Sequence, residues 1–157
     1  MTTKDPDSLY KQAKPDIEAI AQPLFHFSEQ CLRKIGNFLP HGAVLTTKQQ
    51  VELVGAMPKS KDGYSTSVEV LPVLHDAIRK QAMEKSILAV GVAENVTITP
   101  QGESTTRAVK VLVEHQCGLT VALYLPFRKK LFRRLSFGEI FSIPAQPEVK
   151  IWHSDAV

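Results

Sequence analysis

The chain lacks the features from which several classes of protein are recognised. It has two cysteines, Cys31 and Cys117, which are too few for a disulfide framework or a zinc site. Its N-terminal residues contain no apolar signal core, and no stretch approaches the ~18 apolar residues of a membrane-spanning helix. We therefore expect a cytoplasmic protein that needs no disulfide to hold its core.

Sequence motifs of catalysis and nucleotide binding are missing as well. There is no Gly-x-Ser-x-Gly element, and neither cysteine has an evident activating partner. The glycines that could form a phosphate-binding loop stand in unsuitable contexts: Gly36, Gly42, Gly55 and Gly63. We predict no catalytic residue, no cofactor and no metal ligand, although these absences leave open whether the protein is an enzyme.

Positive charge is concentrated in one short segment. The formal net charge is +3, yet residues 128–134, RKKLFRR, hold five of the nineteen basic side chains and no acidic one. The remainder carries fourteen basic side chains against sixteen acidic ones. The basic character therefore belongs to this segment and not to the whole surface.

What the chain does have is a long stretch of strand-like alternation in residues 87–127. In residues 87–98 the alternation predicts one buried face, formed by Leu88, Val90, Val92, Val96 and Ile98. In residues 106–115 three valines face inward, whereas Lys110 and Glu114 face outward. A third apolar row follows: Leu119, Val121, Leu123 and Leu125. The stretch predicts three consecutive antiparallel strands.

The turn between the second and third of these strands fixes their register. A three-residue loop, Gln116–Gly118, with Gly118 in the left-handed conformation would pair His115 with Leu119 and set the valines opposite the third apolar row. A two-residue turn would place the apolar side chains on opposite faces of the sheet. We predict the three-residue loop, because a slip of one residue would expose a whole apolar row.

The N-terminal part of the chain is predicted to contain a long helix. Residues 1–13 are polar and expected to be flexible, and residues 14–157 are expected to form one domain. Apolar residues at helical spacing predict the helix from Pro15 to Ile35. Because proline lacks the backbone donor, we expect a kink or a break at Pro23.

The middle of the chain is predicted to contain a hairpin and a second helix. Residues 43–55 suggest the hairpin, and residues 58–67, PKSKDGYSTS, suggest a loop. The helix is predicted over residues 72–85, with Pro72 in its first turn. An earlier start capped by Thr66 is the alternative, but it would leave Pro72 inside the helix.

The order helix, two strands, helix, three strands predicts a single α+β domain. Its antiparallel sheet has about five strands, a hairpin and a three-strand meander, and two main helices pack on one face or on both. Residues 127–135 form either a short amphipathic helix or an exposed loop, and residues 137–152 an extended tail along the domain. In this succession of elements the chain resembles roadblock-like and profilin-like domains. No motif accompanies the resemblance, so it transfers no function.

Three residues are candidates for a ligand pocket between the first helix and the sheet. Alternation places Glu94 on the buried face, where a carboxylate in an apolar pocket would have a raised pKa; a β-bulge near Asn95 that turns it outward is the alternative. His115 stands at an inner position of a strand end, where a structural histidine is the simpler interpretation. His41 lies in a Pro-His-Gly corner that faces either a pocket or solvent.

Residues 128–134 are the candidate contact for an anionic partner. Five cations there could meet nucleic-acid phosphates, an acidic protein or anionic lipid: Arg128, Lys129, Lys130, Arg133 and Arg134. The alternative is a solvated loop whose Leu131 and Phe132 pack down on the domain. Nucleic acid is the less expected partner, because too few aromatic rings lie nearby for base stacking.

The leading hypothesis is a non-enzymatic interaction module that forms a homodimer, or binds a protein partner, through its sheet. The third strand motivates this hypothesis because its outward side chains are uncharged: Thr120, Ala122 and Tyr124. One rival is a small-ligand-binding protein or enzyme that uses the three pocket candidates. The other rival binds nucleic acid or an anionic surface through residues 128–134.

Overall fold

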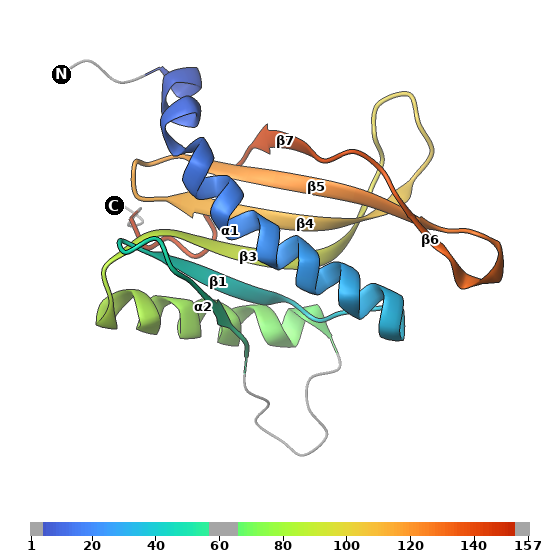
Figure 1. Cartoon of the computed structure of the whole chain (residues 1–157), viewed down its shortest axis with the longest axis horizontal. Coiled ribbons are helices and arrows are strands. Elements are labelled where there is room, and N and C mark those ends of the chain that lie inside the picture. The colour runs from blue at the N-terminus through green and yellow to red at the C-terminus, as the bar shows by residue number, and fades with distance from the viewer. Residues whose placement is uncertain (1–4, 57–65, 153–157) are drawn as a thin grey trace.

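The computed structural model describes residues 5–56 and 66–152, and it places one antiparallel sheet between two helices (Figure 1). The helices are α1 (Pro6–Ile35) and α2 (Ser67–Glu84). The strands are β1 (His41–Thr46), β2 (Val51–Val54), β3 (Ile87–Ile98), β4 (Thr106–His115), β5 (Thr120–Lys129), β6 (Leu135–Phe137) and β7 (Phe141–Pro144). The predicted α+β class and the predicted order of elements are confirmed.

The sheet is larger than the five strands expected. Its order is β2-β1-β3-β4-β5-β6, with β7 paired to β5 beyond β6. The two additional strands come from residues predicted as an extended tail or as a helix or loop, and they pair along β5. Since β1 lies between β2 and β3, α2 carries the chain across one face of the sheet, and α1 covers the other face.

The predicted turn between β4 and β5 is confirmed. Gly118 has a φ of +100°, and the backbone N–H of His115 donates to the carbonyl oxygen of Leu119 at 2.9 Å. The two apolar rows then meet across the strands as expected: Val109 opposite Leu125, Val111 opposite Leu123 and Val113 opposite Val121. These pairs form the core on the α1 side of the sheet.

Through Ala93, β3 is buried on both of its faces, whereas the sequence predicted one buried face. Val90 and Val92 are buried as predicted, in a cluster with α2, but Ala93 on the other face is also fully buried, beneath α1. Gly91 gives the reason: a Cβ there would lie 2.8 Å from Cδ1 of Leu24 on α1. The small residues that suggested an open face are the ones that allow α1 to lie close to the sheet.

α1 is longer than the sequence predicted. It begins at Pro6, so a proline does stand in the first turn, but an earlier one than Pro15. Residues 6–13, expected to be flexible, belong to the helix, which continues without a break through Pro23. Neither α1 nor α2, the two helices within the described ranges, has the length and apolar character needed to cross a membrane.

α2 begins at Ser67 and not at the predicted Pro72. Thr66 caps the helix, because its hydroxyl oxygen accepts a hydrogen bond from the backbone N–H of Glu69 at 3.4 Å. Pro72 therefore lies inside the helix but near its start, where the capped first turn outweighs the one lost donor. Most of the loop predicted over residues 58–67 lies outside the described residues.

Residues 145–152, here called the strap, cross the α2 side of the sheet. The backbone N–H of Ala145 donates to the carbonyl oxygen of Thr120 at 3.1 Å where the strap leaves the edge of the sheet. Val149 is fully buried in the same cluster as Val90, and Trp152 packs against it. The tail thus runs along the domain, as predicted, and closes the part of this face that α2 leaves open.

Candidate functional site

Glu94 is partly buried on the α2 side of the sheet, without the bulge that would have turned it outward. β3 and β4 pair in continuous register here, with Glu94 opposite Lys110. Its carboxylate lies 3.9 Å from the ammonium of Lys110, which is also 3.7 Å from the carboxylate of Glu148 in the strap. Burial raises the pKa of Glu94, and the charge of Lys110 offsets part of the rise.

His115 lies on the opposite side of the sheet and faces α1. Its Nδ1 accepts a hydrogen bond from the backbone N–H of Cys117 at 3.0 Å, so the proton of the neutral ring is on Nε2. Nε2 is 2.7 Å from Oδ2 of Asp16 on α1. The ring therefore joins the turn between β4 and β5 to the first half of α1, which is the structural use that the sequence favoured.

His41 begins β1 and lies beneath the second half of α1. The rings of Phe27 and Phe38 meet it edge to face. Its Nε2 is 3.2 Å from Oγ of Ser28, and its Nδ1 is 3.2 Å from the carbonyl oxygen of Leu39. Burial lowers the pKa of His41, although backbone carbonyl groups oppose the change.

Acid should destabilise the fold in part through His41. Its lowered pKa means that the folded chain binds fewer protons than the unfolded chain below the ordinary pKa of about 6.5. The free energy of unfolding should be independent of His41 above that pH and should fall as the pH drops below it. His41→Gln should remove part of this fall, whereas His26→Gln, on the exposed face of α1, should not. Urea denaturation at a series of pH values measures how steeply the free energy of unfolding falls with pH. An equally steep fall in H41Q would show that His41 does not contribute to it.

The three pocket candidates do not share a site. The sheet separates Glu94 from both histidines. The histidines contact α1 at Ser28 and Asp16, which lie roughly 18 Å apart along the helix. In the part of the chain that the structure describes, no three His, Cys, Asp or Glu side chains are grouped so that they could hold a metal ion.

Glu114 is a buried carboxylate that the sequence interpretation missed, because alternation placed it outward on β4. It does point away from α1, but the strap leaves it 1% exposed. The carboxylate accepts three backbone N–H hydrogen bonds, from Glu148 at 3.1 Å and from Val149 and Lys150 at 2.8 Å. Nε of Arg79 on α2 donates to the carbonyl oxygen of Val149 at 2.8 Å. Sheet and helix therefore hold the strap together.

No protein-family model, no curated protein and no solved structure matches this chain. Its function is therefore inferred from the contacts and surfaces of the described residues. Two surface features are candidate binding sites for a partner: the basic segment, residues 128–134, and the sheet edge at β7.

The basic segment forms the end of a hairpin, where the sequence left a helix or a loop open. β5 continues through Lys129, a 3₁₀ turn spans Leu131–Arg133, and β6 returns along β5. We call residues 128–134 the basic hairpin tip. The described cationic side chains of the tip are exposed: Arg128, Lys129, Lys130 and Arg134. Leu131 and Phe132 do not pack down on the domain, because their side chains are 84% and 94% exposed.

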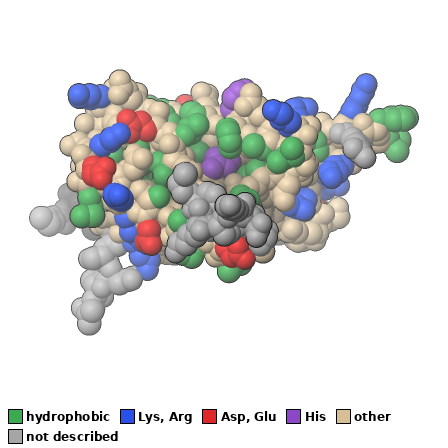
Figure 2. Space-filling view, turned by 90° about the horizontal axis from the view of Figure 1, so that it is seen from below, with side chains coloured by type: hydrophobic (Ala, Val, Ile, Leu, Met, Phe, Trp, Pro, Cys, Tyr) green, Lys and Arg blue, Asp and Glu red, His purple; other side chains and the backbone are tan. Residues whose placement is uncertain are grey.

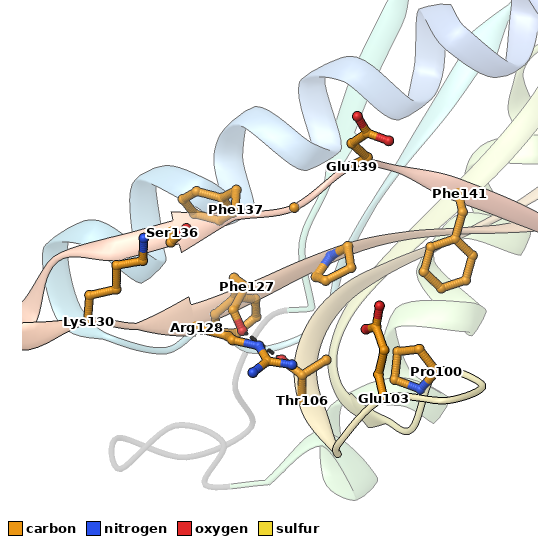
Figure 3. A pocket seen from close by; sticks show the side chains of 12 residues that line it. Pro100, Glu103, Thr106, Phe127, Arg128, Lys130, Ser136, Phe137, Glu139 and Phe141 are labelled. Carbon is orange, nitrogen blue, oxygen red and sulfur yellow. Dashed lines mark hydrogen bonds between the residues drawn. The ribbon is translucent and has the colours of Figure 1, made fainter.

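An open groove of about 480 Å³ lies at the base of the tip (Figure 3). Arg128 and Lys130 line it from the tip, and Phe141 lines it from β7. Glu103 from the turn between β3 and β4, together with Glu139, adds two carboxylates to the same lining. Because cations and carboxylates are balanced there, the groove itself favours neither sign of charge in a ligand.

β7 and β6 form one open edge of the sheet and β2 forms the other; among the described strands, β7 pairs with β5 alone. In an antiparallel ladder, hydrogen-bonded residue pairs alternate with pairs that are not hydrogen-bonded. The hydrogen bond from the N–H of Ala145 to the carbonyl oxygen of Thr120 makes that pair a hydrogen-bonded one. Counting back along β7, the N–H and C=O of Ser142 therefore point away from β5. Large apolar side chains are exposed along this edge: Ile140 at 52%, Phe141 at 40% and Ile143 at 45%. The ring of Tyr124 on β5 stacks on that of Phe141.

The surface predicted on the third strand is covered. β5 is an inner strand of the sheet, and Thr120 and Ala122 are buried, so Tyr124 alone of the three remains partly exposed. The exposed apolar side chains lie one strand further out, on β7. Sequence alternation could not predict the exposed side chains on β7. Residues 138–140 connect β6 to β7 with one residue more than the facing part of β5, and this extra residue interrupts the period of two.

Proposed function

We propose that this protein is a non-enzymatic, cytoplasmic interaction module that forms a homodimer by pairing the β7 edges of two copies. The observation that supports the proposal is the outward N–H and C=O of Ser142, flanked by the exposed side chains of Phe141 and Ile143. An edge of this kind binds a second strand through main-chain hydrogen bonds and gains specificity from the flanking side chains.

A two-fold axis at Ser142 makes the edge self-complementary. In an antiparallel pair centred there, the N–H and C=O of Ser142 exchange hydrogen bonds with the same groups of the other copy. Phe141 of each copy then lies opposite Ile143 of the other, on the α2 side of the joined sheet, and both side chains lose exposed area. Pro144 is compatible with this pairing, because it offers a carbonyl oxygen and has no N–H to satisfy.

The buried groups that are capable of chemistry support a structural use of the interior. His115 is bound to Asp16, and Glu114 is bound to the backbone of the strap. His41 is enclosed beneath α1 beside Ser28. Each of these polar contacts joins two parts of the fold. We therefore expect a partner to bind at surface side chains and not at these buried groups.

Ile143→Lys should convert the dimer to a monomer. Two isoleucine side chains are lost from the symmetric interface and two charges are placed in it, so the dissociation constant should rise by on the order of a hundred-fold or more. Sedimentation velocity over a range of concentrations measures this constant. Val68→Lys is the matched control, since Val68 is 81% exposed on α2 and the variant should remain dimeric. A wild-type chain that is monomeric throughout, or a dimer indifferent to I143K, would overturn the proposal.

A further inference from the structure

The basic hairpin tip projects from one end of the molecule with two apolar side chains at its apex (Figures 1 and 2). Leu131 and Phe132 are almost entirely exposed to solvent. Phe132 has a φ of +63°, a left-handed conformation that bulky residues seldom adopt. The tip thus holds two exposed apolar side chains, one of them on an unfavourable backbone conformation, where a partner can contact them.

Positive charge surrounds this apolar pair. The sequence holds no acidic residue from 128 to 138, and the described cations of the tip are exposed. The last turn of α1 brings exposed Arg33 and Lys34 to the same end of the molecule, where Lys129 and Leu135 line a hollow together with that turn. Ile35, which is 74% exposed, adds a third apolar side chain. Two segments distant in sequence thus combine cations with outward apolar groups.

We propose that this end of the molecule docks on an anionic phospholipid surface. Leu131 and Phe132 enter the boundary between headgroups and acyl chains, and the cations behind them contact lipid phosphates. Amphipathic segments that lie at membrane interfaces combine apolar area with Lys and Arg in the same way. Each such cation near a negatively charged leaflet strengthens binding about five-fold. The docking is peripheral, since the tip is a turn between the strands β5 and β6.

The shape and composition of the tip favour lipid over nucleic acid. Phosphates of a nucleic acid would attract the cations, but a duplex offers no apolar layer in which Leu131 could be buried. Stacking of unpaired bases uses several aromatic side chains along a basic groove, whereas Phe132 is the single aromatic ring within residues 128–134. A projecting apex with an aliphatic residue beside the ring fits a soft surface that it can penetrate.

Flotation of the full-length protein with lipid vesicles tests the proposal. The protein should bind vesicles of phosphatidylcholine mixed with phosphatidylglycerol, and should not bind phosphatidylcholine alone. The double change Leu131→Ser and Phe132→Ser should weaken binding on the order of a hundred-fold, and the double change Lys129→Ala and Lys130→Ala by about 25-fold. Circular dichroism should show that all variants stay folded.

Matched variants elsewhere on the surface serve as controls. Val68→Ser with Met83→Ser removes two apolar side chains that are 81% and 89% exposed on α2. Lys48→Ala with Lys80→Ala removes two exposed cations. Both controls should bind vesicles as tightly as the wild type. Equal losses in the controls and the tip variants, or vesicle binding that needs no anionic lipid, would overturn the proposal.

Insertion of the apex is measured by fluorescence. The single native tryptophan is replaced, Trp152→Phe, and a reporter is introduced, Phe132→Trp. Its emission should shift to the blue on anionic vesicles and be quenched by brominated acyl chains. Unshifted, unquenched emission would contradict insertion.

Binding to nucleic acid is the alternative outcome. The protein would then bind duplex or single-stranded DNA tightly and would not bind vesicles. If the Lys129 and Lys130 variant lost this binding and the Leu131 and Phe132 variant kept it, the tip would be assigned to nucleic acid instead. The tests of lipid or DNA binding at the tip are independent of the proposed dimer, because β7 shares no residue with the tip.

Discussion

Glu114→Gln should destabilise the protein by about 3 kcal/mol and release the strap. The side-chain oxygens of Glu114 accept three backbone N–H hydrogen bonds while almost fully buried. A glutamine amide has one acceptor oxygen and carries no charge, and its NH₂ group would face a backbone donor. Urea denaturation followed by circular dichroism measures the loss, and hydrogen exchange should show lost protection at the amides of Val149 and Lys150.

Two further variants make this test specific. Glu103→Gln changes an exposed carboxylate in the turn between β3 and β4 and should leave stability within about 0.5 kcal/mol of the wild type. Arg79→Met removes the donor to the carbonyl oxygen of Val149 and should loosen the strap with a smaller loss than E114Q. If E114Q were as stable as the wild type, with its strap amides still protected, Glu114 would have no such role.

Gly42→Ala should destabilise the protein by about 2 kcal/mol, because the new Cβ would meet both the sheet and a helix. It would lie 2.8 Å from the carbonyl oxygen of Gly91 and 2.8 Å from Cδ1 of Ile78 on α2. The carbonyl belongs to the backbone of the neighbouring strand and cannot move without disturbing the β1–β3 pairing. Thermal and urea denaturation both measure the effect.

A series of three glycine substitutions separates this contact from a general glycine effect. Gly91→Ala should cost less than Gly42→Ala, because its Cβ would approach the flexible end of the Leu24 side chain at 2.8 Å and no backbone atom that closely. Gly55→Ala should be nearly neutral, since no atom of the described residues, its chain neighbours apart, lies within 4 Å of its Cβ position. Equal losses at all three positions would contradict the close packing of helices on both faces of the sheet.

The fold could be predicted from sequence where the signal is local. Alternation of valines and leucines on either side of Gly118 determines the register of β4 and β5, because a slip of one residue would expose an apolar row. The start of α2 was predicted wrongly, since the cost of Pro72 was given more weight than the cap at Thr66. Both the proline and the capping residue are visible in the sequence, but the sequence does not show that the cap outweighs the proline.

The candidate surfaces could be predicted less well, because they depend on pairings between distant segments. Glu114 alternates as an exposed residue would, and the strap that buries it lies more than thirty positions later in the chain. The alternation of β3 suggested one open face, but it does not show that α1 packs on Gly91. The basic segment was identified from its charge alone, whereas the outward position of Phe132 required the backbone conformation of the turn.

Oxidative cross-linking of Ser142→Cys tests the proposed pairing of the β7 edges most directly. The variant is made in a chain whose native thiols are removed, Cys31→Ala and Cys117→Ala. A hydrogen-bonded antiparallel pair centred on residue 142 places the two Cα atoms about 5.5 Å apart, within reach of a disulfide. We expect mild oxidation to join two copies at this position, while Lys80→Cys on the exposed face of α2 stays uncross-linked. Failure at 142, or equal cross-linking at 80, would contradict the dimer through β7.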